Sequence, residues 1–352
     1  MSFFIGRNDS YINVKIFTPV FIKIEIFHSL QSYRICMKKL KPLVKIIAVL
    51  CLVCALFFLP FLFKTSPSVT SEASEQKEYV TDAKCEVSIK VAGSEIPLEL
   101  EEYVIGVVAA EMPANFQLEA LKAQAIAART YVLKTTNYGE KEIEPTVARQ
   151  VFYDAETRKE NWNKSFEEYE SKVREAVEST AGEIITYNNE LITAMFHSMS
   201  TGMTESSKNY SGNDIPYLQP VASADYQHAP NYESSKKFTI AEWNKLLNVN
   251  WTIKNINQLK IERNNTGRVE NVSMGKQQWT GRDLRTLLDL RSTDFRIEVK
   301  GDQIVVTTEG YGHGVGMSQY GADAMAENGA TAHKILQHYY KDTKIEKINC
   351  KN

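Results

Sequence analysis

Apolar and polar residues repeat with different periods along this chain, and each period predicts a different element of secondary structure. From 85 to 100, CEVSIKVAGSEIPLEL alternates apolar and polar positions around a Gly-Ser pair, which is typical of a hairpin of two short strands. From 101 to 112, EEYVIGVVAAEM carries valines at helical spacing, and from 117 to 136, QLEALKAQAIAARTYVLKTT does the same with leucines and alanines. Pro113 separates the two predicted helices, because proline cannot continue a helix.

The remainder of the chain mixes the same two patterns. SFEEYESKVREAVESTAG, at 165–182, has the period of an amphipathic helix. Further signals predict a hairpin about Asn188 and Asn189, helices within 239–247 and 280–290, a hairpin over Gly301 and Asp302, and a short Ala-rich helix after Tyr320. We therefore predict an α+β fold in which helices and antiparallel hairpins form one body.

A long apolar segment precedes this body. From Ile46 to Phe63, 18 consecutive uncharged and mostly apolar residues follow four lysines. At about 1.5 Å per residue they span roughly 27 Å, which is enough for a bilayer core. The lysines predict a cytoplasmic N-terminus and an extracytoplasmic body, by the positive-inside rule. A cleaved signal peptide is the alternative, but the run exceeds a usual signal core and no small-x-small site follows it.

This placement divides the chain into segments. We predict a cytoplasmic N-terminus at 1–45, a single transmembrane helix at 46–63, a flexible Ser/Thr/Glu-rich stalk at 64–82 and the folded body at 83–352. Met37 opens the basic stretch ahead of the apolar run, whereas the residues before it show no targeting pattern. We expect translation to start at Met37 and residues 1–36 to reflect a misassigned start.

Charge and cysteines fit the same division. Residues 1–64 contain nine Lys and Arg against two Asp and Glu, whereas residues 65–352 contain 32 against 41. An acidic body argues against a nucleic-acid partner, since phosphate binding needs a basic surface. Only Cys85 and Cys350 lie in the body, at its two ends. A disulfide between them and two free thiols both stay open, and the body has no CxxC metal framework.

One carboxyl group stands out in the helical pattern. Glu111 continues the apolar stripe of the first helix at its C-terminal end, at the corner between two Ala-rich helices that can pack closely. A carboxyl held against apolar neighbours at a helix C-terminus is disfavoured as an anion, so we expect its pKa to be raised. Such a group can act as a general acid near neutral pH. A solvated Glu111, or one paired with Arg129, is the alternative.

Two polar loops carry further candidate chemistry. HSMSTGMTESS places His197 and Ser198 near Glu205, but it lacks the GxSxG turn of many serine enzymes, which disfavours a nucleophilic triad. GYGHGVGMSQYGADAMAENG has glycines in a GxGxGxG pattern around Tyr311 and His313 and lacks the GK[ST] of a phosphate loop. These glycines would let the backbone approach a sugar closely, while a tightly turned structural loop is the alternative.

Three segments carry a resemblance to a known family. YVIGVVAAEMPANFQLEALKAQAIAARTYVL, FHSMSTGMTESS and GYGHGVGMSQYGA occur in the order found in stage II sporulation protein D and its LytB-type relatives, and the chain resembles this family over roughly 86–345. The resemblance implies a lytic transglycosylase that cuts the MurNAc–GlcNAc bonds of peptidoglycan strands stripped of stem peptides. Glu111 falls on the family's catalytic acid. Arg129 falls on a position that would orient the acid or bind substrate. The two loops would line the glycan cleft through His197, Ser200, Thr204, Glu205, Tyr311, His313, Gln319 and Tyr320.

The resemblance also implies cofactors and partners. Some clostridial members hold zinc through a Cys that follows the loop His, and HSMST has no such Cys, so we expect neither a metal nor another cofactor. Zinc binding by His197 with His228 or His313 stays open. The implied partners are glycan strands, the amidase stage II sporulation protein P and the membrane scaffold stage II sporulation protein M. The implied place is the septal membrane during engulfment of the forespore. A non-catalytic peptidoglycan-binding protein that stimulates an N-acetylmuramoyl-L-alanine amidase is the alternative.

Overall fold

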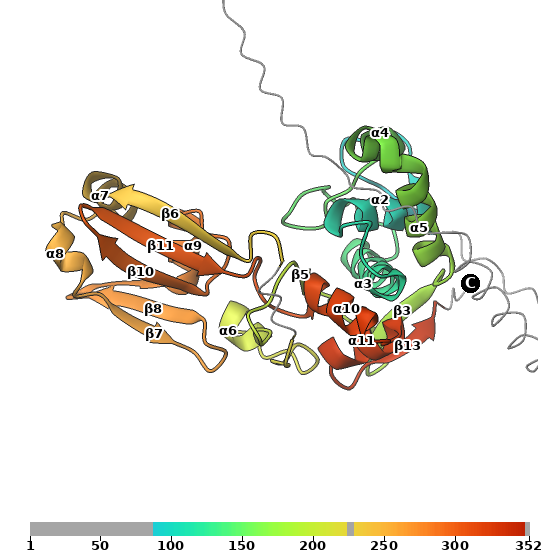
Figure 1. Cartoon of the computed structure of the whole chain (residues 1–352). Helices are drawn as coiled ribbons and strands as arrows, with labels where there is room; N and C mark the ends of the chain where they lie inside the picture. The colour runs from blue at the N-terminus through green and yellow to red at the C-terminus, as the bar shows by residue number, and fades with distance from the viewer. Residues whose placement is uncertain (1–86, 224–228, 349–352) are drawn as a thin grey trace, which may run out of the picture. The chain divides into compact units, whose positions relative to one another are not determined.

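The computed structural model describes residues 87–223 and 229–348. The predicted transmembrane helix, the stalk, Met37 and both body cysteines lie outside these ranges and stay predictions. Among the described residues, no helix combines the length and apolar composition needed to cross a membrane. The described part consists of helices and small, mostly antiparallel sheets (Figure 1), so the predicted α+β class is confirmed.

The first elements are the hairpin and helix pair that the sequence predicts. They are β1 (Ser88–Ile89), β2 (Leu98–Glu99), α2 (Leu100–Glu111) and α3 (Leu118–Thr136). β1 and β2 pair antiparallel, and α2 begins directly after β2. Met112 is extended and Pro113 follows, so α2 ends where the proline requires. α3 packs against α2 and is followed by Asn137, whose left-handed conformation is common at helix C-termini.

The next elements complete the helical region. They are α4 (Ala155–Trp162), the 3₁₀ turn η1 (Asn163–Ser165), α5 (Phe166–Glu178), β3 (Glu183–Tyr187), β4 (Glu190–Leu191), β5 (Phe196–His197) and α6 (Ser207–Ser211). The predicted amphipathic helix is α5. The predicted hairpin is β3–β4, and both turn residues, Asn188 and Asn189, have positive φ, as a two-residue hairpin turn favours.

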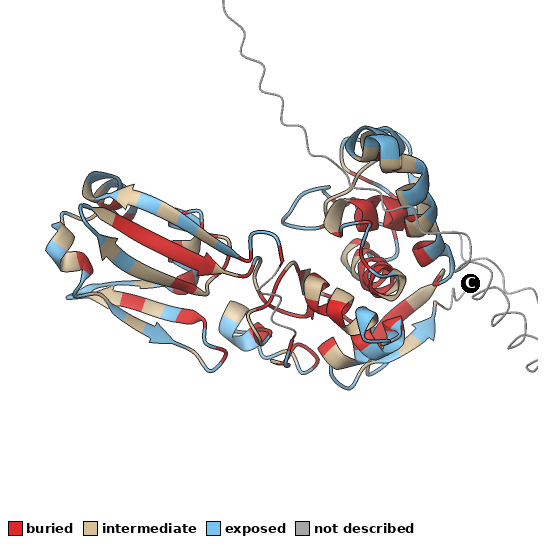
Figure 2. Ribbon diagram, viewed as in Figure 1, coloured by how far each residue is buried: buried red, intermediate tan, exposed pale blue. Residues whose placement is uncertain are grey.

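The C-terminal elements return to the same region. They are β12 (Met317–Ser318), α10 (Gln319–Glu327), α11 (Ala332–Tyr339) and β13 (Lys344–Lys347). β13 pairs with the free side of β3, which gives the sheet order β13–β3–β4. α3 is central, since α2, α5, α10, α11 and β3 all contact it, and Figure 2 shows it as a buried helix. Its alanines leave room for these close neighbours.

A second hydrophobic core lies within residues 233–309. Its elements are β6 (Glu233–Thr239), α7 (Ile240–Leu247), α8 (Ile253–Ile256), β7 (Lys260–Arg263), β8 (Val269–Met274), β9 (Gln277–Thr280), α9 (Gly281–Leu287), β10 (Phe295–Lys300) and β11 (Gln303–Glu309). The sheets are β10–β11–β6 and β7–β8–β9, packed around Trp243, Leu284 and Phe295. The hairpin over Gly301 and Asp302 is confirmed as β10–β11.

Two loops join the cores and pair with each other. β5 lies parallel to β12, Met199 bridges to Tyr311, and Glu205 bridges to Val315. His197 and Val315 touch although they are 118 residues apart in sequence. The second core is therefore an insertion between two segments that lie side by side, which the sequence pattern did not reveal.

Candidate functional site

Glu111 is the last residue of α2 and is half-buried. Its Oε1 accepts a hydrogen bond of 2.7 Å from the backbone N–H of Val151. Burial raises the pKa of the Glu111 carboxyl above its ordinary value, and the Val151 hydrogen bond opposes this by stabilising the anion. The predicted direction of the shift is therefore confirmed. No charged side chain in the described part of the chain contributes to it.

Arg129 lies in α3, is fully buried and is engaged elsewhere. Its Nη2 lies 2.5 Å from Glu101 Oε2, and its guanidinium donates to the carbonyls of Glu183 at 3.1 Å and Val177 at 3.2 Å. The pairing with Glu111 that we considered is not formed. These contacts hold α2, α3, α5 and β3 together. Because Arg129 exposes no surface, its predicted contact with substrate is not supported.

His197 and Ser200 form a buried pair at the start of the first loop. His197 Nδ1 lies 3.2 Å from Val315 O, so it carries the proton, and His197 Nε2 accepts from the Ser200 hydroxyl at 2.7 Å. Burial lowers the pKa of His197 well below its usual value, which keeps the ring neutral at pH 7. No carboxylate hydrogen-bonds this ring among the described residues, and Ser198 is not its partner. A nucleophilic triad is not assembled here.

Glu205 is a second buried carboxylate, and both of its oxygens are satisfied. Oε1 accepts from Ser206 N at 2.8 Å and Asn209 Nδ2 at 2.9 Å. Oε2 accepts from Asn264 Nδ2 at 2.7 Å and Thr266 Oγ1 at 3.0 Å. Glu205 therefore ties the first loop to the connection between β7 and β8.

The other predicted cleft residues divide into buried and surface groups. Thr204 is buried and its hydroxyl accepts from Val221 N at 2.9 Å, while Gln319 is buried with its Nε2 3.4 Å from Gln124 Oε1. Tyr320 is half-buried and meets Phe116 edge to face, with ring centroids 4.8 Å apart. Tyr311 is exposed, and the guanidinium carbon of Arg291 lies 4.2 Å from its ring centroid. Of these four, only the two tyrosines reach the surface.

The glycines of the second loop serve its packing. All four have positive φ: Gly310, Gly312, Gly314 and Gly316. A Cβ at Gly316 would lie 2.0 Å from Met195 O, and one at Gly312 would lie 2.8 Å from His197 Cβ. At Gly312 and Gly316 the close approach is therefore to residues 195–197, at the start of the first loop, which agrees with the structural alternative for this motif.

His313 joins the two loops to the second core. Its Nδ1 accepts from Val315 N at 3.0 Å. Burial, together with the nearby guanidinium of Arg285, lowers the pKa of His313 to about 4. Its ring lies 5.3 Å from that of Tyr210, and the Arg282 guanidinium lies 4.2 Å from the Tyr210 ring centroid. Arg282 also donates to the Tyr210 carbonyl, which fixes this stack.

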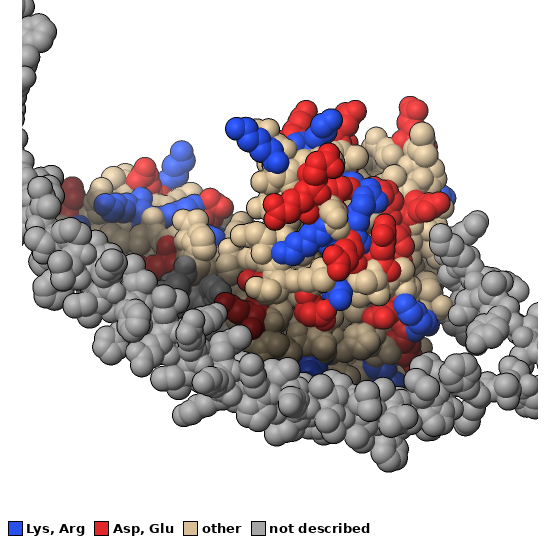
Figure 3. Space-filling view, turned by 45° about the vertical axis from the view of Figure 1, so that its right-hand side comes forward, with Lys and Arg blue, Asp and Glu red and all other residues tan. Residues whose placement is uncertain are grey.

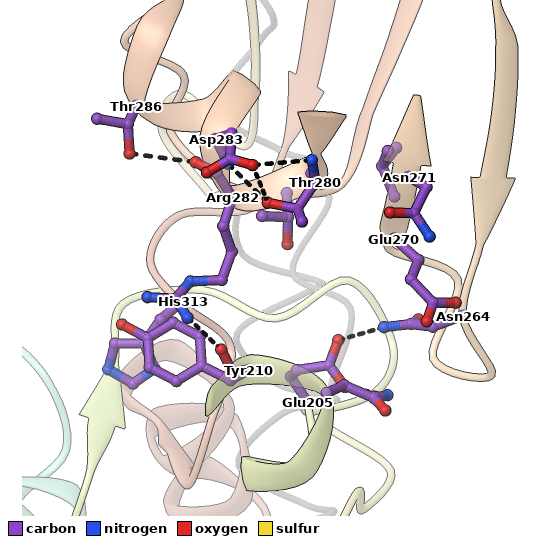
Figure 4. Close-up of a pocket in the computed structure, with 14 residues that line it drawn as sticks. Glu205, Tyr210, Asn264, Glu270, Asn271, Thr280, Arg282, Asp283, Thr286 and His313 are labelled. Atoms are coloured by element: carbon purple, nitrogen blue, oxygen red, sulfur yellow. Dashed lines mark hydrogen bonds between the residues drawn. The ribbon is translucent and has the colours of Figure 1, made fainter. Parts of the chain in front are cut away.

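A polar cavity of about 480 Å³ opens beside this stack (Figure 4). Its lining includes Glu205, Asn209, Tyr210, Asn264, Glu270, Asn271, Arg282, Asp283 and His313. A second cavity of about 550 Å³ shares Asn209, Asn264 and Glu270 with it. Amide, carboxylate and guanidinium groups in one hollow suit a ligand rich in hydroxyl and amide groups. The cavity brings together two predicted residues, Glu205 and His313, while Glu111 lines neither cavity.

The sequence patterns did not predict the residue that holds Glu111 or two of the residues that line the cavity. Val151, which holds Glu111, lies in a stretch without periodicity. Gly106 was the sequence signal that could have indicated this contact, because an isolated glycine inside a helix often marks close packing by another segment. Tyr210 and Arg282 belong to no motif and come together only through the fold.

Metal ligands and surface charge give no further site. In the described ranges, no three His, Cys, Asp or Glu side chains are grouped so as to hold a metal ion, and His228 lies outside those ranges. The expectation of no metal thus stays a prediction. On the face drawn in Figure 3, acidic and basic side chains of the described residues are interspersed.

Comparison with known proteins places these residues in a family. A family model described as Stage II sporulation protein matches residues 94–187, which contain Glu111 and Val151. "Stage II sporulation protein D" of Bacillus subtilis (strain 168) is 41% identical over 269 residues, covering 72% of this chain and 76% of the relative. The protein of the same name in Bacillus amyloliquefaciens is 34% identical over 334 residues, covering 88% and 97%. The "Amidase enhancer" of Bacillus subtilis (strain 168) is 30% identical over 296 residues, covering 68% of this chain and 40% of the relative.

Proposed function

The chain belongs to the stage II sporulation protein D family, and from this premise we propose that it is a membrane-anchored lytic transglycosylase. Its substrate is the glycan strand of peptidoglycan from which stem peptides have been removed. It cleaves MurNAc–GlcNAc bonds and leaves 1,6-anhydro-MurNAc ends.

The environment of Glu111 is the observation that carries this proposal. A half-buried carboxyl with a raised pKa stays protonated at higher pH than an ordinary glutamate. A general acid must hold a proton until the leaving group needs it, so this shift suits the role. The half-exposed position at the end of α2 also leaves the carboxyl accessible.

The chemistry needs only one carboxyl group. Protonated Glu111 gives its proton to the glycosidic oxygen as the bond to MurNAc C1 breaks. The C6 hydroxyl of the same MurNAc then attacks C1, and the Glu111 carboxylate takes the hydroxyl proton. The acid is restored, and the anhydro ring replaces the broken bond without the addition of water. A hydrolase would normally need a second carboxylate as nucleophile or as base for water.

The polar cavity beside Tyr210 and His313 supports glycan binding. Its volume and lining suit N-acetylated sugars, and two residues expected in the cleft, Glu205 and His313, line it. Glu205 is saturated by four protein donors, so it shapes the wall of the cavity. Asn271 and Arg282 remain to donate hydrogen bonds to sugar hydroxyl and acetamido groups.

Location and partners belong to the same proposal. The segment at 46–63 anchors the enzyme in the membrane of the sporulation septum, and the stalk keeps it close to newly made wall. An amidase must remove the stem peptides first, and stage II sporulation protein P would supply that activity. Stage II sporulation protein M would act as the membrane scaffold.

The relative named amidase enhancer favours one alternative function. In that alternative the chain binds peptidoglycan and stimulates an N-acetylmuramoyl-L-alanine amidase without cutting glycan. The same cavity would serve binding, and Glu111 would have no chemical role.

Product analysis separates the two functions. The purified full-length chain is incubated with denuded glycan strands, and the released fragments are analysed by mass spectrometry, with Glu111→Gln as the matched control. Fragments one water lighter than hydrolytic products are expected from the wild type alone. Ordinary reducing ends would mean a hydrolase. Binding without release, together with faster stem-peptide removal by an added amidase, would establish the alternative.

A further inference from the structure

The segment 150–153, which we call the strap, donates the one hydrogen bond that the Glu111 carboxyl accepts among the described residues. Val151 N donates to Glu111 Oε1 at 2.7 Å. Glu111 Oε2 has no hydrogen-bond partner in the described part of the chain. One oxygen is therefore fixed by the backbone, and the other is left to carry the transferable proton.

The strap is attached to both helices that flank it. Gln150 is fully buried, and its Nε2 donates to Ala128 O of α3 at 3.2 Å. Its Oε1 accepts from the hydroxyl of Tyr103 of α2, also at 3.2 Å. The Tyr103 ring stacks on Phe152, with centroids 5.4 Å apart and planes within 3°. The residues on either side of Val151 thus hold its N–H in place.

α2 is shaped to receive the strap. Tyr153 N donates to Gly106 O at 3.1 Å. A Cβ at Gly106 would lie 2.2 Å from Phe152 Cε2 and 2.6 Å from Tyr153 O. Any side chain at Gly106 would push the strap away from α2, because contacts this short are not tolerated.

A buried cation fixes the far end of the strap. Arg158 is 1% exposed, and its Nη1 donates to Tyr153 O at 3.0 Å. Its Nε lies 2.8 Å from Glu170 Oε2, and its Nη2 lies 3.1 Å from Glu102 Oε1. Since Glu102 lies in α2 and Glu170 in α5, the strap is tied to the same frame as the helix that carries Glu111.

We propose that the strap is the positioning element of the catalytic acid, with Val151 holding Glu111 Oε1 and Gly106 as the docking point on α2. This inference rests on the proposed function of Glu111 and adds residues to which no role has been assigned. The strap orients the carboxyl toward a single proton-donating oxygen. It also limits how far burial raises the pKa, since its N–H stabilises the carboxylate.

Few other groups bear on the titration of Glu111. The titratable group beside it is Tyr103 of α2, whose own pKa is raised by burial, with smaller contributions from Tyr131 and Glu111. A tyrosine with a raised pKa is neutral at pH 7, so Tyr103 adds no charge beside Glu111. Removal of the strap hydrogen bond should therefore raise the pKa of Glu111 further, because burial is left unopposed.

Two substitutions at one position test the proposal. Val151→Pro removes the N–H, whereas Val151→Ala keeps it and trims only the side chain. The full-length chain is labelled with ¹³C at glutamate carboxyl carbons, Glu111 is assigned by its loss in Glu111→Gln, and its titration is followed by NMR. We expect a higher pKa in Val151→Pro and an unchanged one in Val151→Ala. Glycan cleavage should fall about 10- to 100-fold in Val151→Pro, and its alkaline limb should move to higher pH.

A second pair of variants tests the same proposal if Val151→Pro does not fold. Tyr103→Phe removes the hydroxyl that holds Gln150, and Tyr339→Phe removes a hydroxyl of a similarly buried tyrosine that lies 3.0 Å from Ser223 Oγ. Tyr103→Phe should shift the Glu111 titration in the direction of Val151→Pro. Tyr339→Phe should leave it unchanged.

The two proposals fail separately. If the pKa of Glu111 is unchanged in both folded variants, Val151→Pro and Tyr103→Phe, the proposal that the strap positions Glu111 is wrong, whatever their glycan-cleaving activity. If the wild type cuts no glycan, the proposed function fails, and the NMR titration still decides whether the strap holds Glu111.

Discussion

Glu111 is half-buried and Glu205 is buried, and the hydrogen-bond partners of the two carboxyl groups differ in kind. Glu111 ends a helix and receives one backbone hydrogen bond on one oxygen. Glu205 receives four hydrogen bonds, two on each oxygen, from the backbone and from three side chains. Burial with a single donor raises the pKa of Glu111, whereas the four donors hold Glu205 in a fixed hydrogen-bond network. The comparison separates a carboxyl suited to proton transfer from one that holds two loops together.

The largest expected effect tests the Glu111 side of this comparison. Glu111→Gln keeps the size of the side chain and its acceptor for Val151 but removes the transferable proton. Cleavage of denuded glycan should fall by about 10²- to 10⁴-fold, with glycan binding retained. Steady-state product formation and a binding isotherm on the same strands measure both. Wild-type turnover by the purified variant would end the assignment.

The next largest effect tests whether the glycines of the second loop are needed for its close packing. Gly316→Ala combines φ +73° with a Cβ 2.0 Å from Met195 O, so the free energy of unfolding should fall by about 2–4 kcal/mol. Gly202→Ala is the matched control, because it shares positive φ, at +87°, but has open space around the Cβ. Urea denaturation should show a loss of only about 1–2 kcal/mol there. Equal losses would mean that close packing of the second loop is unimportant.

A substitution of Glu205 sharpens the contrast further. Glu205→Gln replaces one acceptor oxygen by an amide donor, so the two groups that donate to that oxygen lose it as an acceptor. The free energy of unfolding should fall by about 1–3 kcal/mol. Glu111→Gln, whose single accepted hydrogen bond survives, should change it by less than about 0.5 kcal/mol at pH 5. Similar losses in the two variants would contradict the difference drawn between the carboxylates.

A smaller change in the free energy of unfolding is expected when the pH is lowered. The pKa of His313 is lowered from 6.5 to about 4 in the folded state, so its contribution to stability is present above pH 6.5 and is lost as the pH falls toward 4. His313→Asn retains an acceptor for Val315 N without a titrating ring. Its stability should depend less on pH across this window, as chemical denaturation at several pH values can measure. A parallel decline in both proteins would place the acid sensitivity elsewhere.

The smallest effect has the opposite sign. The folded pKa of Glu111 lies above the usual 4.5, so folding is favoured with the group protonated and stability is lost as the pH rises from 4.5 through the folded value. Glu111→Gln lacks this loss. The stability of the variant relative to wild type should therefore increase between pH 4.5 and 7.5. A constant difference would show that burial does not disfavour the Glu111 anion.

Local patterns predicted the elements that depend on local physics. The first hairpin, α2, α3, α5 and the hairpin over Gly301 follow from periodicity, proline and turn residues. The raised pKa of Glu111 followed as well, because the apolar stripe of its own helix indicates burial. These features require only residues close to one another in sequence.

Features that depend on distant contacts were not predicted. His197 and Ser200 look like loop chemistry in sequence, but they are buried because the glycine loop packs onto them from 118 residues away. The second core was not predicted, because its helices and hairpins carry the same local patterns as those of the first core and only their packing around Trp243, Leu284 and Phe295 sets them apart. Val151 acts through its backbone N–H, which no side-chain pattern can reveal.

The insertion of residues 233–309 has a consequence for how the chain acquires its fold. The two loops that pair across it begin far apart, and closing such a long stretch of chain has an entropic cost that grows with its length. The ends of the insertion meet by themselves, since Gly310 N donates to Tyr232 O at 2.9 Å and Glu233 pairs with Glu309 in the sheet. Once the insertion has folded, it acts as a short tether between the loops. Folding of residues 233–309 therefore lowers the entropic cost of bringing the glycine loop back to the helical region.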